Sequence, residues 1–405
     1  MRMEKTYKDK GKLYNAIHMK KYSDPWISFG VTVLMLFGTL MITSTTAGTT
    51  YSIVSVAFKF VKQILFLFLG YLAMIFTNKV FKFNWFYKLQ WPLFAAFLIV
   101  LLMPFVSVSR GGSNAWISLG PITVQPSEFA KPMMIVLVAS ALYKAQINKR
   151  KWKNFWTLMK GPFIAFLIVE AIVLLQRDLG TAVIIGGITF ICMYLPSHPN
   201  IQKIQKFVVC FLVGAISLGI FAFGFLDKAT DLLKGTPLAH IAVRVENAKD
   251  PLREEVIFDG AFQPANALYG IADSNFVGKG IGKSNRKYGY LTQADNDYIL
   301  AITIEETGIF GFGLIVAMYI LIMHRLLYYA FKTKNVAYKV VLAGNATYLF
   351  LHFLLNVGGV SALIPMTGIP LLFISNGGSS LLAICATIGI SQYCIRHVRM
   401  DELKR

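Results

Sequence analysis

Long apolar runs separated by short polar connections follow one another along the chain, a pattern typical of a protein that crosses a membrane many times. About ten of these runs approach the roughly 20 apolar residues that an α-helix needs to span a bilayer. They lie at residues 26–42, 53–76, 91–106, 129–143, 161–176, 179–196, 207–226, 298–323, 336–364 and 369–395. The pattern predicts an all-α integral membrane protein with about ten transmembrane helices.

Lysine and arginine gather in every second connection between these runs. The basic segments are 1–25, 77–90, 144–160, 197–206, 324–335 and 396–405, whereas 43–51, 107–125 and 361–368 hold only Arg110. Cytoplasmic loops of membrane proteins collect Lys and Arg. We therefore expect a cytoplasmic tail at 1–25, a membrane domain at 26–395 and a second cytoplasmic tail at 396–405.

The composition agrees with this assignment. The 405 residues are 56% hydrophobic and only 15% charged, whereas a soluble domain carries about 25% charged residues. Most of the net charge of +20 comes from Lys and Arg in the expected cytoplasmic loops, where they set the orientation of the protein in the membrane and attract anionic lipid. Because the cations are scattered over separate loops instead of forming one stripe, we expect no nucleic-acid partner.

One connection is far longer than the others. Residues 227–297, between the seventh and eighth expected spans, form a large extracellular loop that holds ten of the chain's twenty acidic residues. Loops of that length are usually functional or disordered. The loop contains the glycine-rich stretch "GKGIGKSNRKYGY" (residues 278–290), which fits either a phosphate-binding backbone or a solvated turn.

Five acidic residues fall at membrane depth: Glu128, Glu170, Asp178, Glu305 and Glu306. Acids there are costly and normally face a protein interior with a partner. Lys131, three residues after Glu128, is on the same helical face, and the pair fits a structural ion pair and a substrate contact equally well. Because neighbouring positions do not share one helix face, we expect one of the two adjacent glutamates to pack against a polar partner.

Four stretches of the sequence resemble the SEDS family, the FtsW, RodA and SpoVE proteins of bacterial cell-wall synthesis. They are "RGGSNAWISLGPITVQPSEFAK" (110–131), "QRDLGTA" (176–182), "GKGIGKSNRKYGYLTQADNDYILAITIEETG" (278–308) and "NVGGVSALIPMTGIPLLFISNGGSSLL" (356–382). Their order is the family's order, and the resemblance extends over nearly the whole chain. The stretch "VGGVSALIPMTG" is more similar to the FtsW division branch than to the RodA branch.

The resemblance implies a peptidoglycan glycosyltransferase that polymerises lipid II at the outer face of the cytoplasmic membrane, in cell division or elongation. It implies a class B penicillin-binding protein as the crosslinking partner, together with other divisome or elongasome membrane proteins. The family's essential aspartate falls on Asp297, and Asp295 takes a less central place. Asn376 stands where the family has a tyrosine.

Glycosyl transfer explains why a carboxylate is needed. A sugar hydroxyl is a weak nucleophile near neutral pH, and a positioned general base raises the rate by about 10² to 10⁴. We assign that role to Asp297, in an inverting transfer. From residue pattern alone, Asp297 also fits a helix N-cap, since Asp and Asn are favoured there.

The remaining candidate site residues are assigned to substrate binding. Cations stabilise the charge that gathers on a leaving diphosphate, and Arg110, Lys131, Arg244 and Lys287 are the candidates for it. A divalent cation, Mg²⁺ or Mn²⁺, would suit the same oxygens, although no metal-ligand spacing is present. The other candidates for contacting the sugar or the lipid head group are Trp116, Glu128, Asp178, Gln263, Asn266 and Ser379.

Two other functions remain open at this point. A flippase or transporter of lipid-linked precursors would also need intramembrane acids, but transporters place them at the midplane of repeated halves. The chain has no evident internal repeat, and its acids crowd one exterior loop, which favours catalysis. A scaffold in the division machinery is the third reading, best treated as a second role because the cytoplasmic tails are short.

Overall fold

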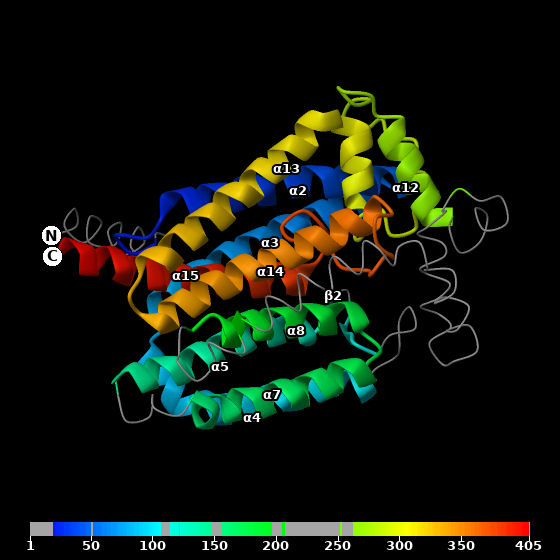
Figure 1. Ribbon diagram of the computed structural model, residues 1–405. Coiled ribbons are helices and arrows are strands. Elements are labelled where there is room, and N and C mark those ends of the chain that lie inside the picture. The colour runs from blue at the N-terminus through cyan, green and yellow to red at the C-terminus, as the bar shows by residue number, and fades with distance from the viewer. Residues whose placement is uncertain are drawn as a thin grey trace, which may run out of the picture.

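The protein is described here from a computed structural model that covers residues 19–49, 52–106, 114–120, 122–147, 155–196, 205–206, 252 and 262–404. In these ranges the chain is almost entirely helical, and the long helices run roughly side by side (Figure 1). Helices α2, α3, α13, α14 and α15 make up one part of the bundle. Helices α4, α5, α7 and α8 make up the other (Figure 1).

The helices are α2 Pro25–Thr49, α3 Ile53–Val80, α4 Phe83–Leu102, α5 Ser127–Ile147, α7 Phe155–Leu175, α8 Leu179–Tyr194, α12 Phe262–Ala272, α13 Ile299–Lys332, α14 Val336–Val360 and α15 Gly378–Leu403. A short 3₁₀ helix, η1 Met103–Val106, extends α4. Strands β1 Ile117–Leu119 and β2 Ile122–Val124 form a small antiparallel hairpin before α5.

The predicted all-α, multi-pass membrane fold is confirmed. Seven of the described helices are long and apolar enough to cross a bilayer, and α8 is a shorter apolar helix. The remaining expected span that falls on described residues, 129–143, is covered by helix α5. The expected span 207–226 lies outside the described residues, so the total of ten spans stays a prediction.

Two expected spans differ from the structure. The last one was expected from residue 369, but α15 begins only at Gly378, because Pro370 lacks a backbone N–H and both Gly368 and Phe373 adopt positive φ. The eighth span is not one continuous helix, since α13 is broken at Gly308 (φ 62°, ψ −151°). That backbone region is essentially restricted to glycine.

The large loop is partly ordered. Residues 227–251 and 253–261 lie outside the described ranges, but helix α12 and the segment leading to α13 are defined. Helix α12 packs against the beginning of α13. The part of the loop closest to Asp297 therefore has a fixed structure.

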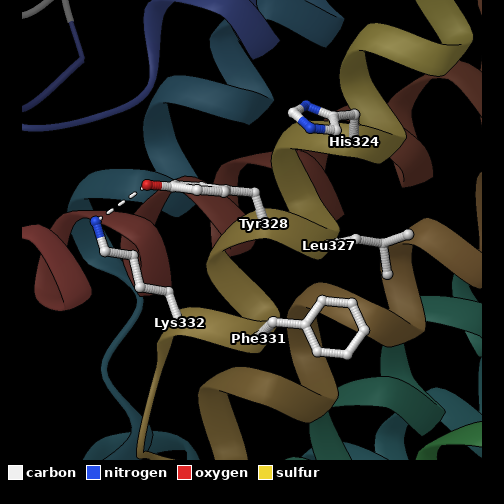
Figure 2. Close-up of a pocket in the computed structure, with 5 residues that line it drawn as sticks. All are labelled: His324, Leu327, Tyr328, Phe331 and Lys332. Atoms are coloured by element: carbon white, nitrogen blue, oxygen red, sulfur yellow. Dashed lines mark hydrogen bonds between the residues drawn. The ribbon is translucent and has the colours of Figure 1, made fainter.

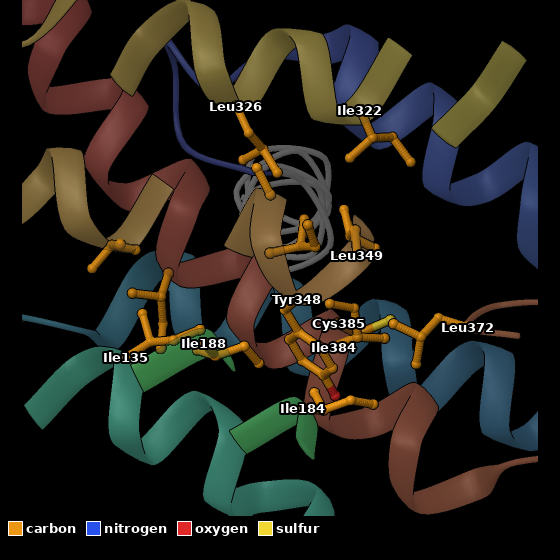
Figure 3. Packing of buried hydrophobic residues seen from close by; sticks show 14 of the residues in the cluster. Ile135, Ile184, Ile188, Ile322, Leu326, Tyr348, Leu349, Leu372, Ile384 and Cys385 are labelled. Carbon is orange, nitrogen blue, oxygen red and sulfur yellow. The ribbon is translucent and has the colours of Figure 1, made fainter. Parts of the chain in front are cut away.

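The centre of the bundle is formed by α5, α8, α14 and α15, in which α5 and α14 each contact the other three helices. Figure 3 shows Ile135, Ile188, Tyr348 and Ile384 from these four helices packed together, and all four side chains are buried. β-Branched isoleucines have few rotamers, so they lose little freedom on packing. In a bilayer, close van der Waals contact of this kind is a main source of helix association.

A buried polar cluster ties three helices together at the end of the bundle where α2 begins and α15 ends (Figure 1). The Asp24 carboxylate, just before α2, accepts hydrogen bonds from Arg325 Nε and from the Tyr329 hydroxyl of α13, each at 3.0 Å. Its backbone N–H donates to Gln392 Oε1 of α15 at 2.7 Å. Burial raises the pKa of Asp24, but the hydrogen bond and charge of Arg325 outweigh it and hold the pKa below its usual value.

Candidate active site

Asp297 lies at the entry to α13, but it does not cap that helix. The N-cap residue is Tyr298, and no side chain caps the helix there. The Asp297 carboxylate has no hydrogen-bond or ion-pair partner among the described residues, and its backbone carbonyl accepts a hydrogen bond from Asn356 Nδ2 at 2.9 Å. The interpretation of Asp297 as a helix cap is therefore wrong.

The Asp297 carboxylate faces bare backbone. A Cβ atom built on Gly368 would stand 3.5 Å from Asp297 Oδ2, so the glycine leaves the oxygen open where a side chain would cover it. Asn356, which is fully buried, also donates to the Ile369 carbonyl at 2.8 Å. One amide thus fixes Asp297 and the segment around Gly368 relative to each other.

A raised pKa accompanies this setting. Burial raises the pKa of Asp297 to about 6, and the negative charge of nearby Asp295 adds to the effect. A carboxyl group with a pKa close to the working pH is suited to accept and release protons. The raised pKa is compatible with the predicted role of Asp297 as a general base, which stays a prediction.

Asp295, by contrast, is engaged. Its Oδ2 accepts hydrogen bonds from Lys59 Nζ of α3 at 3.1 Å and from Asn376 Nδ2 at 2.9 Å. The Asn376 backbone N–H also donates to the Asp295 carbonyl at 2.9 Å. Lys59 was not among the predicted site residues, because nothing in the sequence links an α3 lysine to a loop aspartate 236 positions away.

Glu128 and Lys131 form the expected ion pair on α5. Lys131 Nζ lies 2.6 Å from Glu128 Oε1, and both side chains are buried. Glu128 Oε2 also accepts a hydrogen bond from the Tyr348 hydroxyl at 3.4 Å. The geometry shows the structural role of the pair, and its contact with a substrate stays a prediction.

His352 connects this pair to the segment that faces Asp297. Its Nε2 lies 3.0 Å from Lys131 Nζ, and its Nδ1 lies 3.1 Å from the Pro370 carbonyl oxygen. Because a lysine ammonium only donates, Nε2 accepts, and Nδ1 carries the proton and donates to Pro370. His352 is thus a buried, hydrogen-bonded residue that links α5 to the segment after α14.

Asp178 and Ser379 are joined through Gln125. Asp178 Oδ1 caps α8 by accepting from the Thr181 N–H at 3.1 Å, and its Oδ2 accepts from Gln125 Nε2 at 2.6 Å. The Gln125 backbone N–H donates to Ser379 Oγ at 3.3 Å. Gln125 was missed as a site residue, although it stands inside the quoted stretch at 110–131.

Helix α8 also contacts the segment around Gly368. A Cβ atom on Gly180 would lie 3.0 Å from the Thr367 carbonyl oxygen. The segment between α14 and α15 therefore contacts the elements that carry the predicted site residues Asp178 and Asp297. It also contacts His352, which was not among the predicted site residues.

Glu305 and Glu306 belong to a second network, in which both carboxylates hold the loop before α13. Glu305 accepts hydrogen bonds from Lys279 Nζ at 2.8 Å and from the Asn285 backbone N–H at 2.9 Å. Glu306 accepts from Lys287 Nζ at 2.9 Å. The expectation that one of the two glutamates has a polar partner was too narrow, because the loop wraps around two faces of the helix.

Lys287 and Asn266 take part in this second network. Lys287 is buried, and its ammonium also lies 3.4 Å from Ser44 Oγ of α2. Asn266 Oδ1 accepts a hydrogen bond from Arg286 Nη1 at 2.9 Å. In this arrangement the Lys287 charge is balanced by Glu306 and is not presented to solvent.

The remaining predicted site residues are not joined to either network by described contacts. Trp116 is half-buried beside β1, and Gln263 of α12 has a buried Oε1 with no described partner. Arg110 and Arg244 lie outside the described residues. The described part of the chain holds no group of three or more His, Cys, Asp or Glu placed to share a metal ion, and binding of Mg²⁺ or Mn²⁺ stays a prediction.

A shallow apolar pocket lies well away from Asp297. It is lined by His324, Leu327, Tyr328, Phe331 and Lys332, all on one face of α13, and Figure 2 shows the hydrogen bond between Lys332 and Tyr328, which is 3.2 Å long. His324 lies about four helical turns beyond the Gly308 break. None of the five residues that line this pocket is a carboxylate.

Comparison with known proteins gives a consistent result. The family of cell cycle proteins that comprises FtsW, RodA and SpoVE matches residues 25–399. The chain is 30% identical to the probable peptidoglycan glycosyltransferase FtsW of Bacillus subtilis over 96% of its own length and 94% of that protein. It is also 30% identical to the stage V sporulation protein E of the same organism, over 94% and 99%.

Solved structures show the same fold. A chain of a peptidoglycan synthase complex that coordinates polymerization and crosslinking aligns with a TM-score of 0.67 at 23% identity, over 93% of this chain and 98% of that one. The rod shape determining protein RodA of Thermus thermophilus aligns with a TM-score of 0.61 at 23% identity, over 92% and 97%.

Proposed function

The chain belongs to the FtsW, RodA and SpoVE family, and we propose that it polymerises lipid II into glycan strands with Asp297 as the general base. Glycosyltransferase activity on peptidoglycan precursors is the activity by which the FtsW relatives are named. The observation that carries the proposal is the Asp297 carboxylate, which is unpaired in the described structure and has a pKa raised to about 6. The Asp295 carboxylate, two residues away, is paired with Lys59.

The reaction follows from these groups. The 4-hydroxyl of the acceptor's N-acetylglucosamine attacks the anomeric carbon of the donor's N-acetylmuramic acid, and its proton passes to Asp297. The bond from that carbon to the diphosphate oxygen breaks, and the diphosphate leaves with the electron pair. A single displacement converts the α-diphosphate into a β-glycoside. The proton acceptor contributes about 10² to 10⁴ to the rate.

Lys59 is suited to bind the leaving diphosphate. It lies two turns into α3, a helix of which most of the surface is exposed, and its own side chain is 39% exposed. A polyprenyl tail can remain among lipid chains along such a helix while the phosphates meet the ammonium group at the interface. Lys62, one turn further along α3, extends the same cationic surface, and Arg110 and Arg244 remain proposed contacts from outside the described residues.

The two ionic networks have a supporting role in this proposal. Glu128, Lys131 and His352 hold the segment around Gly368 through the Pro370 carbonyl. Gln125 links Asp178, at the start of α8, to Ser379 of α15. Lys287, first expected at the diphosphate, is assigned instead to positioning the loop through Glu306. A divalent cation between Asp297 and the diphosphate oxygens stays part of the proposal, with most of its ligands supplied by substrate.

Partner, branch and orientation are also proposals. The likeness to a chain from a complex that coordinates polymerization and crosslinking supports a class B penicillin-binding protein as partner. The equal identities to FtsW and to the sporulation protein leave the division branch a prediction. The expected cytoplasmic termini rest on the distribution of Lys and Arg.

The decisive experiment compares purified native protein with Asp297→Asn in polymerisation of labelled lipid II, each with and without a class B penicillin-binding partner. We expect the amide variant to lose at least about 10² in rate, because the base is lost and the shape is kept. Asp273→Asn is the matched control, since Asp273 is an exposed carboxylate of the same loop and should retain activity. Equal rates for native protein and Asp297→Asn would refute the base assignment, and lipid II translocation without polymerisation would support a flippase instead.

A further inference from the structure

The break in α13 coincides with the expected outer boundary of the hydrocarbon layer. The charges of Arg325, paired with Asp24, and Lys332, paired with Glu402, mark one interface of this helix. A helix crosses the hydrocarbon layer in about 20 residues, which leads back from these two positions to residues 305–312. Gly308 lies in the middle of that range. The long part of α13 runs obliquely across α2 (Figure 1). A tilted helix needs more residues to cross the hydrocarbon layer, so a tilt of α13 would place Gly308 deeper in the membrane.

A second segment of the chain is attached at this break. The Ile309 N–H donates to the Phe276 carbonyl at 3.0 Å, and the Lys279 and Gly280 N–H groups donate to the carbonyls of Glu305 and Glu306 at 2.9 Å each. A Cβ on Gly308 would collide with the Phe276 carbonyl oxygen. Residues 276–281 are therefore held at the same depth as the break.

The side chains exposed here are apolar. Phe276 is 79%, Val277 71% and Phe310 70% exposed, and Ile281 and Ile309 are also exposed. We call these five residues the apex patch. It is continuous with the exposed, lipid-facing side of α13, which includes Ile320, and a cation, Lys283, is exposed beside it. Apolar side chains flanked by a cation are typical of segments that lie in a membrane interface.

We propose that the apex patch inserts into the outer leaflet and anchors the loop before α13 at the level of the lipid head groups. Water is a poor environment for five adjacent exposed apolar side chains, whereas the neighbouring turns of α13 are already expected to face lipid. The lysine at the edge would lie among the phosphates of the head groups.

The anchor has a consequence for the site. The loop is tied to Glu305 and Glu306, two turns after Asp297 in the first part of α13, so the depth of the apex patch sets the height of the carboxylate above the membrane. A lipid-linked substrate presents its sugar at a fixed height over the same surface. This consequence rests on the proposed function, whereas the insertion itself does not.

Insertion can be measured by spin labels in nanodiscs containing phosphatidylglycerol. Val277→Cys reports on the apex patch, Ile320→Cys is the lipid reference on α13, and Asn285→Cys is the water reference, an exposed polar position in the same loop. The native chain measures background labelling of its own cysteines. The readout is the relative accessibility of each label to oxygen, which partitions into lipid, and to a water-soluble nickel chelate.

We expect the Val277 label to resemble the Ile320 label, with oxygen accessibility several-fold higher relative to nickel than at Asn285. A Val277 label that resembles Asn285 would overturn the proposal. So would a label exposed to water in the protein alone that becomes shielded from both reagents when the transpeptidase is added, because the patch would then be a protein interface. Phe276→Cys repeats the measurement if Val277→Cys does not fold. No step of this experiment requires catalytic activity.

Discussion

At the scale of single residues, Asp295 and Asp297 have different surroundings. Asp295 is ion-paired with Lys59 and hydrogen-bonded by Asn376, whereas Asp297 faces the backbone of Gly368 with no described partner. The charge on one carboxylate favours the protonated form of the other. This asymmetry is the basis for proposing Asp297 as the proton acceptor, with Asp295 as a group that raises its pKa.

The pH dependence of the rate tests this coupling. Asp297 must be deprotonated to act as a base, so kcat/KM should fall as the pH drops through about 6, the raised pKa of Asp297. In Asp295→Asn the repulsive charge is gone, the pKa of Asp297 decreases, and the acidic limb should move to lower pH. An acidic limb that stays at the same pH in Asp295→Asn would exclude the coupling, and Asp273→Asn serves again as the control for a lost loop charge.

At the scale of elements, the break in α13 divides one long helix into two parts with different tasks. The part before Gly308 carries the two glutamates that hold the loop, and the part after it continues as the lipid-facing span. Two features require a glycine at position 308: its backbone angles, and the Phe276 carbonyl oxygen, which lies where a Cβ atom would be. The break therefore joins the loop to the membrane helix.

Gly308→Ala should disrupt this junction. A non-glycine residue at φ 62° and ψ −151° costs about 1–3 kcal/mol, and the added methyl group would push the loop away. We expect a lower midpoint of thermal unfolding and faster proteolysis within residues 276–290. Gly313→Ala, on the same helix with open space around the built Cβ, should leave both unchanged. If the two variants behave alike, the junction is not the constraint described here.

At the scale of the whole molecule, polar contacts hold both ends of the bundle. Asp24 joins α2, α13 and α15 at the end where α2 begins, and the segment between α14 and α15 joins α5, α8 and α13 at the other. Buried ion pairs of this kind are weak evidence for stability but can specify one arrangement. The site is thus built where several helices end, beside the membrane.

The crossing of residues 207–226 is a prediction at this scale. Lys206 should lie in the cytoplasm and Asn285 outside, because one span separates them. In intact cells, a membrane-impermeant maleimide should label Asn285→Cys and should label Lys206→Cys only after the membrane is opened. The native chain gives the background. Labelling of both variants in intact cells would mean that residues 207–226 do not cross the membrane.

The sequence by itself determined the membrane class and the approximate location of the described spans, with ends that differ by up to nine residues, and it singled out Asp297 as the candidate base. Hydropathy is a local property, and the motifs around Asp297 are contiguous, so both can be read along the chain. For Glu128 and Lys131, the sequence left a structural ion pair and a substrate contact equally open. The structural role became visible only from their burial and from the contact of Lys131 with His352.

Only the tertiary structure decided which groups surround Asp297. Lys59, Asn356 and Asn376 are far apart along the chain, and packing brings them to two neighbouring aspartates. The break at Gly308 and the late start of α15 also depend on contacts, since an apolar run looks the same whether it is one helix or a broken one. The spacing of apolar residues shows which face of a segment can be buried, whereas the fold decides which other segments that face packs against.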